Sequence, residues 1–190
     1  HYLARETDQK IVVVDKLTYA GNRASIESLE AEGRLDLIEA DIMDAPRMAR
    51  IVEETAPEAI FHLAAETHVD RSIDGPAAFV ATNVAGTCAM LEAARAFHDE
   101  LEGSQKAAFR FIHVSTDEVF GSLGDEGAFR ETTPYAPSSP YSASKAGADH
   151  LARAWHHTYG MDTVVTHCSN NYGPYQFPEK LIPLIISNCI

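Results

Sequence analysis

The sequence predicts an α/β protein built on a doubly wound parallel sheet. Short apolar runs alternate along the chain with longer segments of helical character. The runs are almost continuously hydrophobic, as strands covered on both faces are. Hydrophobic residues at 45% and charged residues at 23% are usual proportions for a globular domain, and 190 residues are enough to bury a core.

The expected elements follow from these runs. Pro76 suits the first position of a helix, and Ser139 is placed to cap a helix that starts at Pro140. The segment 172–183 breaks the alternation and is expected to be irregular. We expect strands at 11–15, 35–41, 59–65, 109–115 and 162–169, and helices near 23–32, 45–56, 76–98 and 140–159.

Composition excludes several classes of function. The net charge of −13 argues against a nucleic-acid surface, which needs a basic patch. No apolar run approaches the roughly 20 residues of a membrane span, and no leader peptide opens the chain. Three scattered cysteines and the spacing of the histidines fit neither a disulfide framework nor a metal site. These features favour a reduced, cytoplasmic, metal-free protein.

Asp15 ends the first expected strand. In a Rossmann-type sheet an acid at this position binds the ribose diol of NAD and repels the 2′-phosphate of NADP. A simple turn carboxylate is an equally good interpretation of Asp15 alone. The Gly-rich loop that such an acid accompanies would lie about 20 residues earlier, before His1. Asp41 ends the next strand in the same way and is placed to reach the adenine.

Tyr141 and Lys145 are the pair of residues in the sequence that most specifically indicates catalysis. Their i, i+4 spacing puts both side chains on one face of the predicted helix 140–159. A nearby ammonium stabilises a phenolate, so we expect Lys145 to lower the pKa of Tyr141 toward a value useful in general-base catalysis.

Ser115 and Thr116 precede this pair at the end of a strand, so that hydroxyl, tyrosine and lysine follow one another along the chain. With "FHLAAETHVDRS" (61–72) and "NVAGT" (83–87), this order resembles the extended short-chain dehydrogenase/reductase family over essentially the whole length. The resemblance implies NAD as cofactor, and a sugar hydroxyl activated by Thr116, Tyr141 and Lys145.

The adjacent acids Asp117 and Glu118 narrow this interpretation. Elimination of water across C5–C6 of a hexose needs one acid and one base beyond the groups that oxidise C4. Neighbouring side chains of an extended strand point to opposite faces, so both can reach one substrate only if the backbone turns, which Gly121 makes plausible. "STDEVFG" (115–121) resembles the motif of nucleotide-sugar 4,6-dehydratases, in which Asp is the general acid and Glu the general base.

The resemblance also implies ligand-binding residues, each of which could by itself be ordinary loop polarity. A domain that binds NAD is expected over 1–171, without its first strand and Gly-rich loop, and a substrate-binding segment would begin at 172–190. The implied NAD-binding residues are Asp15, Lys16, Thr18, Asn22, Asp41, Ile42, Leu63, Ala64, Ala65, Thr82 (or Asn83), Ser115, Tyr141, Lys145, Cys168 and Asn170. Those implied for a nucleotide sugar such as dTDP-glucose are Glu66, His68, Arg71, Ser72, Thr116, Asn170, Glu179, Lys180 and Leu181.

Alternatives remain open at this point. A nucleotide-sugar 4-epimerase or a related decarboxylase needs Tyr141, Lys145 and Thr116 but not Asp117, and a non-catalytic NAD-binding protein or fragment needs none of them. The resemblance also implies a homodimer that pairs through helices 76–98 and 140–159, although burial within one chain explains much of the same apolar pattern.

Overall fold

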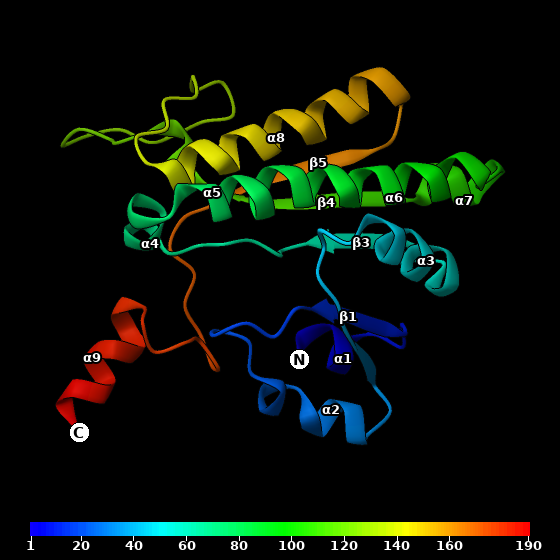
Figure 1. Cartoon of the computed structure of the whole chain (residues 1–190), viewed down its shortest axis with the longest axis horizontal. Coiled ribbons are helices and arrows are strands. Elements are labelled where there is room, and N and C mark those ends of the chain that lie inside the picture. Colours follow the sequence, from blue (N-terminus) through cyan, green and yellow to red (C-terminus); the bar gives the residue numbers. More distant parts are fainter. The chain divides into compact units, whose positions relative to one another are not determined.

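The computed structural model describes all residues 1–190 and confirms the parallel α/β class, since every strand pairing is parallel. The chain divides into two compact units. The first joins residues 1–41 to 170–190, and the second comprises residues 42–169. Figure 1 draws both units with their elements labelled.

The first unit is a two-stranded parallel sheet with short helices. Ile11 pairs with Leu35 and Asp15 with Glu39, so that both strands run in register. Ala4, Leu29 and Leu35 form its small core. Its elements are α1 (Tyr2–Glu6), β1 (Ile11–Asp15), a 3₁₀ turn (Arg23–Ser25), α2 (Glu27–Ala31), β2 (Leu35–Glu39) and α9 (Leu181–Cys189). No residue of α9 is buried, although most of its residues are apolar.

The second unit holds a three-stranded parallel sheet of order β3-β4-β5. Its elements are α3 (Ala45–Thr55), β3 (Ala59–His62), α4 (Val69–Asp74), α5 (Pro76–Phe79), a π-helix (Val80–Gly86), α6 (Thr87–Glu100), α7 (Gly103–Ala108), β4 (Arg110–Thr116), a 3₁₀ turn (Asp117–Phe120), α8 (Pro140–Tyr159) and β5 (Thr163–Cys168). The register pairs His62 with His113 and Thr116 with Cys168, so the carboxyl ends of β4 and β5 lie next to each other.

The strand pairs match parts of the standard doubly wound order 3-2-1-4-5-6. In this chain β2 and β1 correspond to the third and second strands of the standard order. Strands β3, β4 and β5 correspond to its fourth, fifth and sixth strands. The strand that would carry the Gly-rich loop is not among the described residues, so the expected single sheet is present as two hydrogen-bonded sets.

The helices are positioned by local capping. The hydroxyl of Ser139 accepts the N–H of Ser142 at 3.0 Å, and the Ser142 hydroxyl accepts the N–H of Ser139 at 3.0 Å. This capping box confirms the predicted start of α8, and Gly160 ends it in a left-handed conformation with φ +69°. In Figure 1, α8 runs alongside the continuous stretch α5–α6 over β4 and β5.

Some elements differ from the sequence-based expectation. Strand β2 ends at Glu39 rather than 41, and β3 ends at His62 rather than 65, because the chain leaves the sheet as soon as the ladder of hydrogen bonds ends. Helices α4 and α7 were not predicted. Each is six residues long, which is too short to show a helical period in the sequence.

The expectation that no stretch could cross a membrane needs a correction. The helical stretch Pro76–Glu100 is long and apolar enough by length and composition alone. Phe79, Leu91 and Ala94 within it are buried against the rest of the second unit, as the residues of a core helix are. By that burial we interpret it as a core helix.

The burial of Leu91 generates a stability prediction. Its side chain has no exposed surface, so Leu91→Ala leaves a cavity and is expected to lower the free energy of unfolding by about 3 kcal/mol. Urea denaturation measures this change. The matched substitution Leu123→Ala, at a side chain that is 47% exposed, is expected to change it by less than about 0.5 kcal/mol.

Candidate active site

Tyr141 and Lys145 lie one turn apart on the buried face of α8. Tyr141 is 8% exposed and Lys145 is 4% exposed. The Lys145 ammonium donates a hydrogen bond of 2.8 Å to the carbonyl of Val114, two residues before the end of β4. The Tyr141 ring packs edge-on against Phe79. The predicted pair therefore stands directly over the carboxyl end of β4.

The electrostatics of this pair correct the expectation from the sequence. Burial, followed by the charge of Glu118, raises the pKa of Tyr141 to about 12, and a hydrogen bond with Thr116 lowers it in part. Burial lowers the pKa of Lys145 to about 8, opposed by the charge of Asp149. The expectation that Lys145 lowers the pKa of Tyr141 is wrong for this structure, because its ammonium is bound to Val114 and burial dominates the phenol.

The backbone turns at the acidic pair, as predicted. Asp117–Phe120 form a 3₁₀ turn whose first N–H groups are capped by Thr116, since its hydroxyl accepts the N–H of Glu118 at 3.2 Å. Successive side chains of a 3₁₀ helix diverge by about 120° rather than the 180° of a strand. The turn lets Asp117 and Glu118 face one region, and Glu118 lies close enough to Tyr141 to raise its pKa.

A neighbouring loop holds this turn from the other side. The N–H of Ala136 donates a 2.9 Å hydrogen bond to the carbonyl of Val119. Gly121 has φ +86°, and a Cβ at that position would lie 2.7 Å from the carbonyl oxygen of Ala136. Glycine is thus required here for two reasons, the conformation of its own backbone and the close approach of the loop.

Asn83 organises the chain that leaves β3. Its side-chain oxygen accepts the N–H of Glu66 at 2.8 Å, and its amide nitrogen donates to the Glu66 carbonyl at 3.0 Å and to the Ser144 hydroxyl at 2.9 Å. Asn83 is 1% exposed. Asn83 thus connects the chain after β3 to α8, while its neighbour Thr82 is half-buried. The backbone after β3, with Leu63, Ala64 and Ala65, is fixed relative to α8.

The other predicted residues of the second unit are placed less uniformly. His68 caps α4 by accepting the N–H of Arg71, and Arg71 itself is exposed. Ser72 is fully buried and its hydroxyl donates to the Val69 carbonyl, so this hydroxyl serves the helix. Cys168 lies beside Thr116 at the end of β5, Ser115 is buried at the end of β4, and Ile42 is buried.

The remaining predicted residues belong to the first unit. One oxygen of Asp15 accepts the N–H of Leu17 at 2.7 Å, and Lys16 forms a salt bridge of 2.5 Å with Asp41. Asn22 caps the 3₁₀ turn that follows it. The carboxylate of Glu179 accepts a hydrogen bond from Tyr19. Thr18, Asn170 and Leu181 are exposed, and Lys180 caps α9 through its backbone position.

The sequence interpretation missed a set of buried polar residues behind the site. Asp149 lies one turn after Lys145 on α8 and has no exposed surface, and it is surrounded by His113, His167 and Tyr135. The one signal available in the sequence was spacing, since an acid four residues after Lys145 lies on the same helix face.

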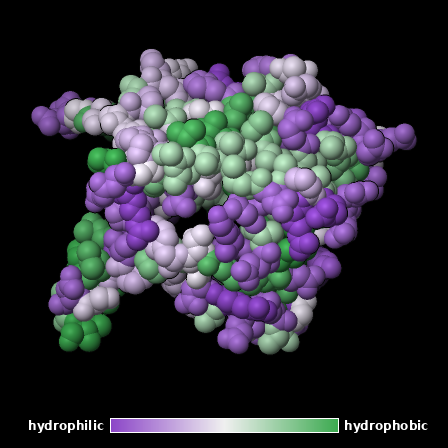
Figure 2. Space-filling model, in the orientation of Figure 1, coloured by the Kyte–Doolittle hydropathy of each residue, from purple (hydrophilic) through white to green (hydrophobic).

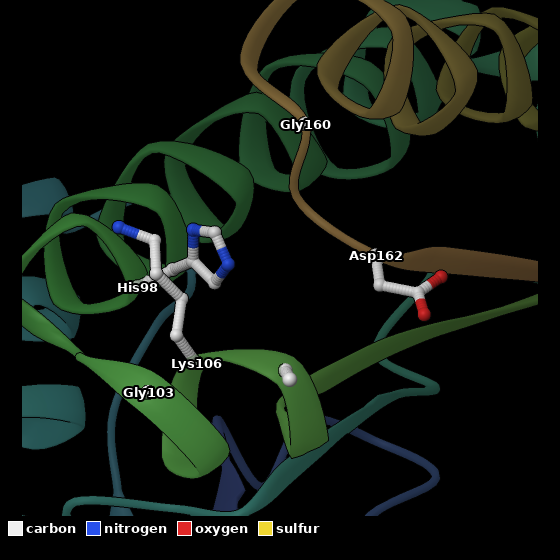
Figure 3. Close-up of a pocket in the computed structure, with 6 residues that line it drawn as sticks. His98, Gly103, Lys106, Gly160 and Asp162 are labelled. Atoms are coloured by element: carbon white, nitrogen blue, oxygen red, sulfur yellow. The ribbon is translucent and has the colours of Figure 1, made fainter.

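A pocket lies elsewhere and shares no residue with this site. It has a volume of about 400 Å³ and is lined by His98, Gly103, Lys106, Ala107, Gly160 and Asp162. Figure 3 shows His98 and Lys106 on one side of it and Asp162 on the other. Lys106 donates to the carbonyl of Asp99, and Asp162 pairs with Arg110 at 3.0 Å. The charges at its rim are thus already partnered.

The chain is similar in sequence to known 4,6-dehydratases. Residues 1–190 match the family model described as GDP-mannose 4,6 dehydratase. The chain is 57% identical over 198 residues to dTDP-glucose 4,6-dehydratase 1 of Escherichia coli (strain K12), covering 100% of this chain and 55% of that protein. It spans about half the length of the curated relatives it matches.

The chain is also similar to solved structures of a dehydratase and an epimerase. A dTDP-glucose 4,6-dehydratase from Streptomyces venezuelae, solved with NAD bound, has a TM-score of 0.86 and 48% identity, covering 97% of this chain and 53% of that one. A UDP-glucuronic acid 4-epimerase from Bacillus cereus has a TM-score of 0.84 at 25% identity, covering 99% of this chain and 57% of that one.

Gly121 generates a prediction for the site. Gly121→Ala introduces a Cβ at a positive φ and against the Ala136 carbonyl, so it is expected to lower the free energy of unfolding by about 2 kcal/mol. Urea denaturation midpoints measure the effect. Gly124→Ala is the matched control, because a Cβ there meets nothing within 4 Å. Equal midpoints for the two variants would contradict the close approach.

Proposed function

Because the chain belongs to the GDP-mannose 4,6-dehydratase family, we propose that its protein is a dTDP-glucose 4,6-dehydratase, a lyase that works with bound NAD. The observation that carries this proposal is the capped turn that presents Asp117 and Glu118 beside Thr116 and Tyr141. The 57% identity to a protein named dTDP-glucose 4,6-dehydratase supports the same substrate.

The residues present fit NAD at two points. Asp15 is exposed at the carboxyl end of β1, where an acid binds a ribose diol. Ala64 and Ala65 are small, half-buried residues after β3, and Tyr141 and Lys145 stand at the end of β4. Bound NAD would supply a hydride acceptor for C4 of the sugar and, once reduced, a hydride donor for C6.

The protein's own groups would perform the proton transfers. Tyr141, assisted by Thr116 and Lys145, takes the proton of the C4 hydroxyl as the hydride leaves C4. The resulting C4 ketone acidifies C5, so that Glu118 removes the C5 proton while Asp117 protonates the departing C6 hydroxyl, which leaves as water. A proton then returns to C5 as the hydride reaches C6. The net change is loss of one water and formation of a 4-keto-6-deoxy sugar.

The pKa of Tyr141 links the two stages. A phenol with a pKa of about 12 is mostly protonated at neutral pH, so Tyr141 takes the C4 hydroxyl proton through its minor phenolate form. The charge of Glu118 is the largest electrostatic contribution to this pKa. Removing this charge favours the phenolate. A variant that neutralises Glu118 is therefore expected to retain C4 oxidation, even though it lacks the base needed for elimination.

The second candidate is a nucleotide-sugar 4-epimerase, favoured by the structural likeness to the UDP-glucuronic acid 4-epimerase. A 4-epimerase removes and returns a hydride at one carbon and has no use for an acid at residue 117. A catalytically inactive NAD-binding protein is opposed by the intact, buried Tyr141 and Lys145.

The acid–base pair generates the central test. In the full-length protein, Asp117→Asn and Glu118→Gln are each expected to slow formation of the 4-keto-6-deoxy product by at least about 100-fold, because each removes one proton-transfer group. Reduction of bound NAD by dTDP-glucose is expected to persist in both variants. Product formation is followed by the alkali-dependent absorbance of the 4-keto sugar, and reduction by the absorbance of the reduced nicotinamide.

The matched controls are Asp125→Asn and Glu126→Gln, an exposed acidic pair in the loop that follows. Both are expected to leave the rates unchanged. Normal dehydration by the Asp117 and Glu118 variants would contradict the dehydratase proposal. Turnover of a UDP-sugar without dehydration of dTDP-glucose would favour the 4-epimerase instead.

We also propose a homodimer that pairs through the helical face of α5, the π-helix Val80–Gly86, α6 and α8. Figure 2 shows hydrophobic surface where Figure 1 draws these helices. In α5 and the π-helix, Val80 is 53% exposed, and Ala77, Ala78 and Ala85 are exposed. Small side chains of this kind allow helices to approach closely.

Charge placed on this face is expected to separate the subunits. Ala85→Arg should convert a dimer of the full-length protein into a monomer, since an unpaired guanidinium would be buried at the interface. Light scattering after size-exclusion chromatography gives the mass. Ala107→Arg, on α7 outside the face, is the control and should remain dimeric; a dimeric Ala85→Arg protein would exclude this interface.

A further inference from the structure

Asp149 is a buried carboxylate that the proposed reaction does not use. It has no exposed surface, and its side chain projects from α8 toward β4, β5 and the loop before α8. One oxygen accepts a hydrogen bond of 3.1 Å from the Tyr135 hydroxyl, and the same oxygen lies 3.2 Å from Nε2 of His167. The other lies 3.1 Å from Nε2 of His113, without hydrogen-bond alignment.

The charge states of this cluster define the direction of the hydrogen bonds. Burial would raise the pKa of Asp149, but its contacts with His113 and His167 lower it to about 2. Burial and then Asp149 raise the pKa of Tyr135 to about 12, opposed by Arg153. At neutral pH an ionised Asp149 therefore accepts a hydrogen bond from the Tyr135 hydroxyl, and the Tyr135 oxygen lies 3.1 Å from Nε2 of His167.

Tyr135 connects this cluster to the acidic turn. Its ring packs against Phe120, the last residue of the turn, with ring centroids 5.3 Å apart. The next residue, Ala136, donates its N–H to Val119 within the turn. Phe120 also packs against His167, with ring centroids 4.7 Å apart. These three contacts connect the turn to Tyr135, His167 and Asp149, in addition to the cap that Thr116 provides.

We propose that Asp149, His167 and Tyr135 form an anchor that positions the Asp117–Phe120 turn for the elimination step. The three are positioning residues and touch neither substrate nor cofactor in this account. This inference rests on the proposed dehydratase function, and it divides the site into two separately supported parts. Tyr141 and Lys145 are held by the capping box of α8 and by Val114, whereas Asp117 and Glu118 depend on the anchor.

Tyr135 is the residue that tests the anchor with the least disturbance. Asp149 also raises the pKa of Lys145, so a change at Asp149 would alter both parts of the site. Tyr135→Phe removes one hydroxyl and keeps the ring that packs on Phe120. Tyr159→Phe is the matched control, because it makes the same change at the far end of α8, where the ring contacts Trp155 and Arg95.

The experiment compares wild type, Tyr135→Phe and Tyr159→Phe in the full-length protein with dTDP-glucose. In Tyr135→Phe we expect dehydration to slow by about tenfold, which corresponds to roughly 1.4 kcal/mol in the barrier. C4 oxidation should keep its rate, so reduced nicotinamide accumulates during turnover and its absorbance reports the imbalance. Tyr159→Phe should behave as wild type.

Hydrogen exchange provides a readout that is independent of activity. The amide of Ala136 is expected to exchange faster in Tyr135→Phe than in wild type, because its bond to Val119 loses the support of the anchor. Unchanged exchange together with unchanged dehydration would overturn the anchor, as would an equal loss of oxidation and dehydration. If wild type fails to convert dTDP-glucose, the proposed function fails, and the exchange at Ala136 still decides whether the anchor exists.

Discussion

The hydrogen bond from Lys145 to the carbonyl of Val114 is the interaction on which the site depends. It fixes the first two turns of α8 against the end of β4 at 2.8 Å and places a buried ammonium beside Tyr141. A buried charge is costly unless it is paired, and here the backbone carbonyl and the nearby Asp149 compensate it. The parallel register places Thr116 beside Cys168. Thr116, Asp117 and Glu118 all lie close enough to Tyr141 to influence its pKa.

Much of the fold could be predicted from the sequence because its signals are local. The strand Ile11–Asp15 and the start of α8 at Pro140 follow from an apolar run and from a Ser-Pro cap. The turn at Asp117 followed from chemistry, since two adjacent acids can serve one substrate only if the chain bends. Helices α4 and α7 left no period to read, and the π-helix Val80–Gly86 has the composition of an α-helix.

What could not be predicted depends on packing between distant segments. Asn83 was one of two neighbours implied for NAD binding, and only the structure shows that its amide binds Glu66 and Ser144. The pKa of Tyr141 was expected to fall because Lys145 is near in sequence, but burial and Glu118 raise it. Asp149 was overlooked because a single acid on a helix is usually solvated, and its burial arises from strands β4 and β5 and from Tyr135.

The π-helix between α5 and α6 changes the number of residues per turn within one continuous helical stretch. It holds Asn83 against Glu66, while Thr87, the first residue beyond it, contacts Nε2 of His62 at 2.8 Å. Both contacts fasten the same exit from β3, one at the strand and one beyond it. Shortening this stretch by one residue would restore α-helical spacing and change both the rotation and the rise that separate Asn83 from Thr87. The length of the segment 80–86 is therefore as constrained as the identity of its residues. An insertion or deletion there would disturb the contacts that Asn83 and Thr87 make at the end of β3.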